Sequence, residues 1–102
     1  MATVDTVNDV MTTTKVAMRP PQQYDVIIYN DTTTTMEFVI LVLMSIFQKS
    51  FEDATTLTLL IDELGLGVAG TYSYEIATQK RDDTINAARI NGFQLKCQVA
   101  PV

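Results

Sequence analysis

The sequence predicts an α+β fold, in which a small three-stranded antiparallel sheet packs against three helices in the order β-α-α-β-α-β. Two short segments, 24–29 and 67–72, are rich in β-branched or aromatic residues and are bounded by polar or turn residues, as strands are. A third segment, 93–99, alternates apolar with polar side chains, which indicates a strand with one face in water. The segments between these strands carry the spacing and capping residues of helices.

The first helix is expected after the polar junction that follows the first strand. Thr34 and Glu37 match the capping-box pattern, in which each side chain binds a free backbone amide at a helix start. We therefore expect a helix from about residue 35 to residue 48. Its sequence is apolar nearly all round, which predicts burial on more than one side unless Leu41 or Met44 is exposed.

The later elements are bounded by serines and glycines. Ser50 is expected to cap the second helix, and Gly65 is expected to end it. The buried face of that helix is predicted from i, i+3 and i+4 spacing and comprises Phe51, Ala54, Leu57, Ile61 and Leu64. The strand at 67–72 follows, and Ser73 is placed to cap a third helix that ends near Gly92.

The length of 102 residues predicts one domain, because a second hydrophobic core needs roughly 50 residues or more. Residues 1–20 are Thr-rich, lack periodicity and end at a Pro-Pro pair, so we expect a flexible N-terminal arm before a domain at 21–102. The single cysteine, Cys97, has no partner for an internal disulfide, which favours a reducing, cytosolic setting.

Composition argues against several classes of function. A net charge of −5 with scattered basic residues disfavours nucleic acid and favours basic or amine-bearing ligands. The densest apolar run, 36–47, is shorter than the roughly 20 residues that a bilayer needs, so no membrane partner is expected. The chain has no histidine, which removes Ser-His and Cys-His nucleophilic systems and most zinc sites. We therefore expect no enzyme, no cofactor and no metal.

Some local patterns have a plain structural explanation. The glycines at 65, 67 and 70 match GxGxxG, but a dinucleotide site must follow a strand and open a helix, and here that order is reversed. Asn30 and Asp31 end a strand, where Asx turns are common. Asp62 lies in the last turn of a helix, where the helix dipole disfavours a carboxylate; it is either simply exposed or part of a cation site.

Five segments in order carry a resemblance to a known family: RPPQQYDVIIYND, TMEFVILVL, EDATTLTLLI, GVAGTYSYEIATQK and LKC. Together they extend from about Arg19 to Val99. They resemble ClpS, the adaptor that hands proteins with particular N-terminal residues to a Clp AAA+ protease. The resemblance implies a ClpS-like fold and a non-enzymatic adaptor that binds hydrophobic N-terminal residues, called N-degrons, and delivers their proteins to the protease.

The resemblance also implies which residues act. A polar rim that holds the free α-ammonium of the substrate maps to Asn30, Asp31, Thr32, Thr34 and Asp62. A hydrophobic pocket for the first side chain maps to Met36, Val39, Thr58, Ile61 and Leu95. Contacts with the N-terminal domain of the Clp unfoldase map to Glu75 and Lys80, and the arm before Pro20 corresponds to the segment used in delivery. The implied setting is the bacterial cytosol or an equivalent compartment, such as the plastid stroma or a phage-infected cell.

Three positions depart from the pattern that the family usually shows. Thr32 replaces an aspartate, and Asp62 replaces a histidine, so a carboxylate leaves the loop and another appears across the rim. The loss of histidine removes titration of the rim near neutral pH. Thr58 replaces a methionine of the pocket wall, and such a change in size alters discrimination between first residues by roughly 1 to 3 kcal/mol.

The two rim departures also allow a second interpretation. A ClpS-like interaction protein that kept the docking surface but lost the pocket would occupy the unfoldase and inhibit or redirect its choice of substrate. A degradation assay separates the two, because an adaptor raises and a blocker lowers the turnover of N-degron reporters. A small enzyme is a third possibility, but neither histidine nor paired carboxylates of catalytic spacing support it.

Overall fold

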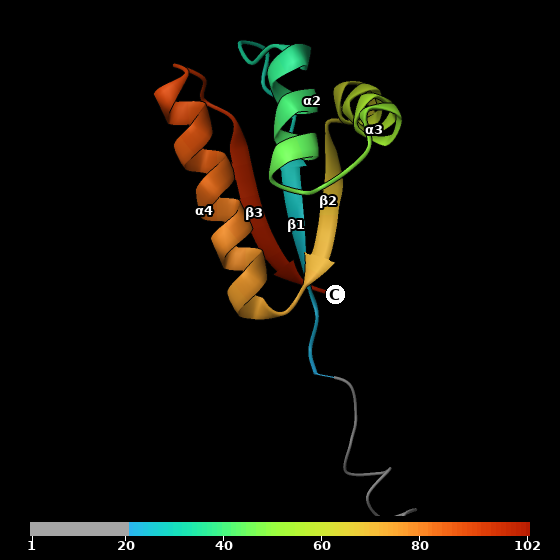
Figure 1. Cartoon of the computed structure of the whole chain (residues 1–102), viewed down its shortest axis with the longest axis vertical. Helices are drawn as coiled ribbons and strands as arrows, with labels where there is room; N and C mark the ends of the chain where they lie inside the picture. Colours follow the sequence, from blue (N-terminus) through green and yellow to red (C-terminus); the bar gives the residue numbers. More distant parts are fainter. Residues whose placement is uncertain (1–20) are drawn as a thin grey trace, which may run out of the picture.

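Strand β1, Tyr24–Tyr29, is the central strand of the sheet. The structure is a computed structural model that describes residues 21–102, so the arm predicted at 1–20 lies outside the described residues. The other elements are α2 (Met36–Ser45), α3 (Phe51–Leu64), β2 (Leu66–Tyr72), α4 (Tyr74–Ile90) and β3 (Lys96–Pro101). This order and these three helices confirm the predicted α+β fold (Figure 1).

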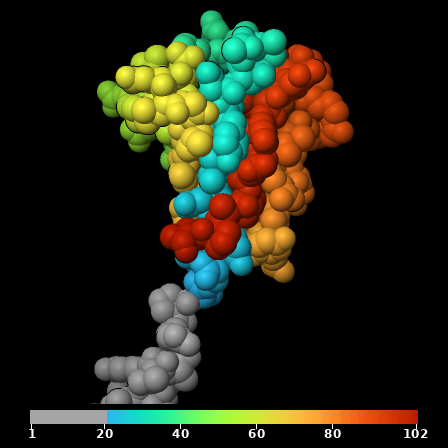
Figure 2. Space-filling model, turned by 180° about the vertical axis from the view of Figure 1, so that it is seen from behind, coloured from blue at the N-terminus to red at the C-terminus, as the bar shows by residue number. Residues whose placement is uncertain are grey.

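The sheet has the strand order β2-β1-β3, and both pairs are antiparallel. Tyr29, the last residue of β1, lies opposite Leu66 in β2 and Lys96 in β3. The helices cover one face of the sheet, while the other face is visible from behind in Figure 2. Because β1 has a neighbour on both sides and helices above it, Val26 and Ile28 are completely buried.

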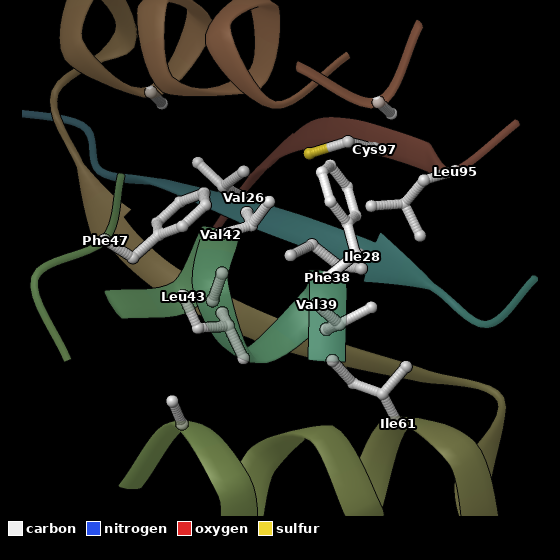
Figure 3. Close-up of a cluster of buried hydrophobic side chains, with 14 residues drawn as sticks. Val26, Ile28, Phe38, Val39, Val42, Leu43, Phe47, Ile61, Leu95 and Cys97 are labelled. Carbon is white, nitrogen blue, oxygen red and sulfur yellow. The ribbon is translucent and has the colours of Figure 1, made fainter. Parts of the chain in front are cut away.

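The core fills the space between this sheet and the helices (Figure 3). Helix α2 contributes two adjacent pairs separated by one turn, which are Phe38, Val39, Val42 and Leu43. Helix α3 packs on α2 and β2, and α4 packs on the sheet; small residues are buried in both, namely Ala54 in α3 and Ala77 and Ala88 in α4. Leu41 and Met44 are exposed, so α2 is buried along one face and not all round.

The prediction that Thr34 caps α2 was wrong by one residue. Thr35 is the N-cap, and its hydroxyl oxygen accepts a hydrogen bond from the Phe38 amide at 3.2 Å. Thr34 lies in the loop before the cap, where its hydroxyl donates to Asp31 Oδ2 at 2.7 Å. The helix also ends earlier than residue 48, since Gln48 has a left-handed φ of 53°.

The boundaries of α3 agree with the prediction, and its buried face agrees in part, since Ala54 and Ile61 are buried and Leu57 packs against the core. Ser50 caps the helix, accepting from the Asp53 amide at 3.1 Å, and Gly65 ends it with a φ of 93°. The predicted ends of the apolar face are exposed, at 63% for Phe51 and 70% for Leu64. The buried positions are Ala54, Thr58 and Ile61, because only the middle of the helix packs on α2 and β2.

The last strand begins later than expected. β3 starts at Lys96, because that residue pairs with the end of β1, and residues 93–95 precede the sheet. Ser73 occupies the N-cap position of α4, as predicted, although its side chain makes no capping hydrogen bond. The glycines at 65, 67 and 70 lie at the C-cap of α3 and within β2, so they do not open a helix. None of the helices within residues 21–102 is both long enough and apolar enough to cross a membrane.

Candidate functional site: a cavity at the end of β1

A cavity of about 260 Å³ lies where the end of β1, the loop before α2, α2 itself and α3 meet. The lining residues are Tyr29, Asn30, Asp31, Thr32, Thr34, Met36, Val39, Thr58, Ile61, Asp62 and Leu95. The structure therefore brings together all ten residues that the sequence assigned to the rim and the pocket. Tyr29 was missed, although its position directly before Asn30 at the strand end was a usable signal.

A backbone hydrogen bond helps to hold the two sides of the cavity mouth together. The Asn30 amide donates to the carbonyl oxygen of Gly65 at 2.9 Å, which ties the loop after β1 to the end of α3. Gly65 can offer this carbonyl because its left-handed conformation ends the helix there. Asp62, one turn earlier in α3, consequently shares the cavity with the loop residues.

Asp31 organises the loop and remains ionised. Its Oδ2 accepts hydrogen bonds from the hydroxyls of Thr33 at 2.6 Å and Thr34 at 2.7 Å. These two hydrogen bonds lower the pKa of Asp31 from its ordinary value of 3.8, because they stabilise the carboxylate. Among residues 21–102 no side-chain donor is bonded to Oδ1, so the carboxylate keeps acceptor capacity for a ligand.

The cavity mouth carries negative charge, and none of the cationic side chains of residues 21–102 lines it. Asp62 is exposed and lines the cavity from α3, opposite the loop that carries Asp31. Within residues 21–102, no lysine or arginine lines the cavity, and no hydrogen bond uses the side chain of Asn30, Thr32 or Asp62. Two carboxylates and an amide oxygen beside a cavity are suited to a positively charged hydrogen-bond donor.

The interior of the cavity is apolar. Val39, Ile61 and Leu95 are buried, and Figure 3 shows Val39 of α2 and Ile61 of α3 facing each other. Met36 lines the cavity but is exposed, which places it at the entrance. Thr58 is the one buried polar residue of the lining. An apolar cavity with a few polar groups at its mouth is the usual form of a small-ligand site.

Neither a metal centre nor a reactive thiol is found in the described part of the chain. Residues 21–102 contain no group of three or more His, Cys, Asp or Glu side chains that could hold a metal ion. Burial raises the pKa of the Cys97 thiol to about 12, so the thiol stays protonated near neutral pH.

A comparison with protein-family models identifies this architecture. The model described as "ATP-dependent Clp protease adaptor protein ClpS" matches residues 19–98. The chain belongs to the ClpS family. The match spans the whole cavity and all six elements except the end of β3.

Individual ClpS proteins are similar over most of their length. The chain is 45% identical over 85 residues to the ATP-dependent Clp protease adapter protein ClpS of Lawsonia intracellularis, covering 83% of this chain and 78% of that one. It is 40% identical over 93 residues to the protein of the same name from Desulfatibacillum aliphaticivorans, covering 91% and 89%. The structure of Agrobacterium tumefaciens ClpS2 bound to L-phenylalaninamide superposes with a TM-score of 0.78 and 26% identity, covering 81% of this chain and all of that one.

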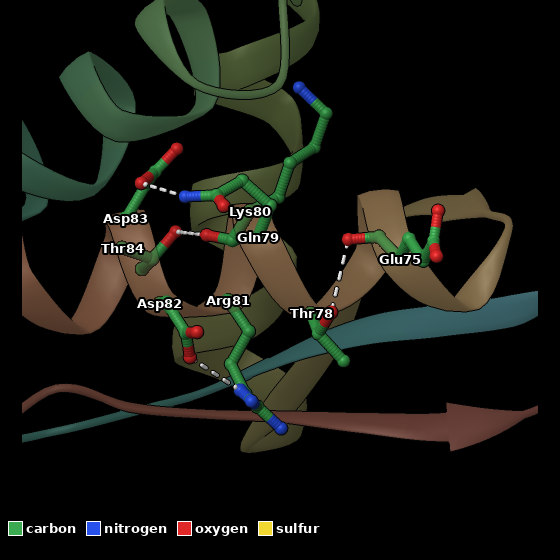
Figure 4. Close-up of polar contacts among 8 residues, drawn as sticks. All are labelled: Glu75, Thr78, Gln79, Lys80, Arg81, Asp82, Asp83 and Thr84. Atoms are coloured by element: carbon green, nitrogen blue, oxygen red, sulfur yellow. Dashed lines mark hydrogen bonds and ion pairs between the residues drawn. The ribbon is translucent and has the colours of Figure 1, made fainter.

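The two residues assigned to unfoldase contact in this ClpS-family chain lie on α4 and differ in environment. Glu75 is exposed in the first turn. Lys80 is partly buried, and its Nζ donates to the Ile46 carbonyl at 2.6 Å and to Gln48 Oε1 at 3.2 Å. Figure 4 shows the Lys80 side chain extending away from α4, and these bonds bring it to the end of α2. A cation there also compensates the negative end of the α2 dipole.

Proposed function

We propose that this protein is a non-enzymatic adaptor that captures the hydrophobic first residue of a substrate protein in the cavity and delivers that protein to a Clp AAA+ protease. One observation carries the proposal: a cavity with buried apolar walls opens beside two carboxylates, and no basic side chain of residues 21–102 lines it. Membership of the ClpS family and likeness to a ClpS2 bound to L-phenylalaninamide support it, since that ligand pairs an apolar side chain with an amine.

The free α-ammonium would bind at the mouth of the cavity. Asp31 offers its carboxylate from the loop, and Asp62 offers its carboxylate from α3. A hydrogen bond to a charged group contributes about 1.5 to 3 kcal/mol. Burial of the first side chain between Val39 and Ile61 adds roughly 1.5 to 3 kcal/mol. The hydrogen bond to the ammonium and the burial of the side chain together select the N-terminus of a chain that begins with an apolar residue. An internal peptide segment offers an apolar side chain but no ammonium.

The α4 surface would supply docking on the N-terminal domain of the unfoldase. Glu75 is exposed and free of side-chain hydrogen bonds within residues 21–102, so its charge is available to a partner. Lys80 Nζ has a third hydrogen-bond donor beyond the two that it uses within the fold. This role belongs in the cytoplasm, or in a compartment that holds an equivalent protease.

Titration calorimetry with short peptides that begin with Phe, Tyr, Trp or Leu tests the recognition step. Each peptide is compared with its N-acetylated form, which keeps the side chain but removes the ammonium. We expect binding of the free peptides and a loss of at least roughly tenfold on acetylation, because one charge-assisted hydrogen bond is worth that much. Equal affinity for free and acetylated peptides would refute the role of the rim.

The inhibitor alternative retains one supporting observation, namely that the rim departs from the usual pattern at Thr32 and Asp62. Both residues nevertheless line an open cavity, which favours the adaptor. Degradation of an N-degron reporter by the Clp protease separates the two functions. Addition of this protein accelerates turnover if it is an adaptor and slows it if it is a blocker.

A further inference from the structure

Thr58 is the one residue of the buried cavity wall whose side chain carries a polar atom. Four of the lining residues are buried: Val39, Thr58, Ile61 and Leu95. Three of them have purely hydrocarbon side chains, and Thr58, at 3% exposure, carries a hydroxyl. The chemistry of this hydroxyl therefore decides which polar group, if any, a ligand side chain can carry into the cavity.

The hydroxyl of Thr58 is restricted to one hydrogen-bonding role. Its Oγ1 donates to the Ala54 carbonyl at 2.7 Å, one turn earlier in α3. A hydroxyl has one proton and two acceptor lone pairs, so this bond uses its donor and leaves only acceptor capacity. Towards a ligand, Thr58 Oγ1 is consequently an acceptor and not a donor.

The cavity has room for an aromatic side chain. Its volume of about 260 Å³ exceeds the roughly 150 Å³ of an apolar protein cavity that binds benzene. A phenyl ring therefore leaves space for a hydroxyl or for a second ring. Tyrosine and tryptophan carry an O–H or N–H donor on an otherwise apolar ring, whereas phenylalanine and leucine carry none.

We propose that Thr58 is a specificity-determining residue, whose buried hydroxyl oxygen accepts a hydrogen bond from the first side chain of the substrate and so favours tyrosine or tryptophan over phenylalanine or leucine. The inference rests on the proposed function, because it assigns the first side chain to this cavity. A tyrosine buried against hydrocarbon alone would lose its hydrogen bond to water without replacement. Against Thr58 the bond is replaced, and phenylalanine gains nothing from the same oxygen.

The test uses peptides that are identical except for the first residue, which is Tyr, Trp, Phe or 4-fluorophenylalanine. The last of these is close to tyrosine in size but has no donor. Fluorescence anisotropy gives the affinity of each peptide for the unaltered protein, for Thr58→Val and for Thr58→Ser. Valine keeps the branched shape and removes the hydroxyl, while serine keeps the hydroxyl. Thermal unfolding of each variant verifies that it is folded.

We expect the unaltered protein to bind the Tyr peptide roughly threefold to tenfold more tightly than the 4-fluorophenylalanine peptide, as one neutral hydrogen bond allows. Thr58→Val should abolish this ratio, and Thr58→Ser should retain it. The ratio cancels any general effect of a substitution on cavity shape. A ratio that persists in Thr58→Val, or a preference for Phe in the unaltered protein, would overturn the inference but leave the proposed function standing. Absence of binding for every free-amine peptide would refute the proposed function itself.

Discussion

The mouth of the cavity and the surface of α4 both carry charged residues, but the fold uses those charges differently. On α4, Lys80 binds the end of α2, and Arg81 pairs with Asp82 at 3.0 Å. At the cavity mouth, Asp31 uses one carboxylate oxygen for the loop and Asp62 uses none within residues 21–102. Charge on α4 is thus partly structural, whereas most of the charge at the mouth is not used by the fold within residues 21–102, and we propose that it serves a ligand.

This difference predicts how substitutions divide between stability and binding. Removing the Asp62 carboxylate from the mouth should weaken peptide binding and leave the free energy of unfolding nearly unchanged, because no hydrogen bond within residues 21–102 uses it. Removing Lys80 should lower the free energy of unfolding, because its partner carbonyl at Ile46 loses a donor. A mouth variant that lowers the free energy of unfolding as much as a Lys80 variant does would show that the two regions are not distinct.

The largest effect is expected for Asp31→Asn, which removes the charge and keeps the size of the side chain. Loss of a charge-assisted hydrogen bond to the ammonium costs about 1.5 to 3 kcal/mol, or roughly 10- to 150-fold in affinity. Asp25→Asn is the matched control, because Asp25 also accepts a bond from a threonine, Thr71 at 2.6 Å, but does not line the cavity. Calorimetry that finds equal losses in the two variants would contradict the assignment of Asp31.

Lys80→Met should lower the free energy of unfolding by about 1 to 2 kcal/mol. The methionine keeps most of the aliphatic stem but loses two hydrogen bonds and the contact of the ammonium with the Tyr72 ring, whose centroid is 5.3 Å away. Glu75→Gln is the control and should change stability by less than about 0.5 kcal/mol, since Glu75 is exposed. Urea denaturation measures the free energy of unfolding of both variants. Similar losses for Lys80→Met and Glu75→Gln would show that the Lys80 hydrogen bonds do not stabilise the fold.

A smaller effect is expected for Asp62→Ala, at about 0.5 to 1.5 kcal/mol of binding free energy, because its exposed carboxylate is screened by water. Thr32→Ala should cost less, since Thr32 has no charge to offer the ammonium. Glu63→Ala is the matched control, as this neighbouring acid is exposed but does not line the cavity. Equal losses for Asp62→Ala and Thr32→Ala would contradict the transfer of charge across the rim.

The sequence predicted the elements well because their signals are local. Ser50 and Gly65 mark the ends of α3 through their own backbone chemistry. The cap of α2 was misplaced because two threonines stand side by side: Thr35 accepts from the Phe38 amide, while the Thr34 hydroxyl bonds Asp31 within the loop. That bond belongs to the conformation of the loop, which residue types alone do not encode.

The buried face of α3 shows a second limit of sequence patterns. Hydrophobic periodicity selected Phe51 and Leu64, which are exposed, and passed over Thr58, which is buried. Burial there depends on where α2 and β2 end, and thus on tertiary packing. The ten cavity residues came from the resemblance to ClpS, because no periodicity connects a strand end with a helix more than 20 residues later.

The smallest effect is expected from pH, and it sharpens the contrast between a carboxylate rim and one that contains histidine. Asp31 has a pKa below its ordinary value of 3.8, so its charge is present throughout the neutral range and is lost only as pH falls through that lowered pKa. The chain has no histidine, and a peptide α-ammonium loses its proton near pH 7.7 to 8.0. Peptide affinity should therefore change by less than about twofold from about pH 5.5 to 7 and should fall above about pH 8. Calorimetry from about pH 5.5 to above pH 8 checks both the constant affinity and its fall. A steep change near pH 6.5 would mean that a group other than Asp31 or the ammonium controls binding.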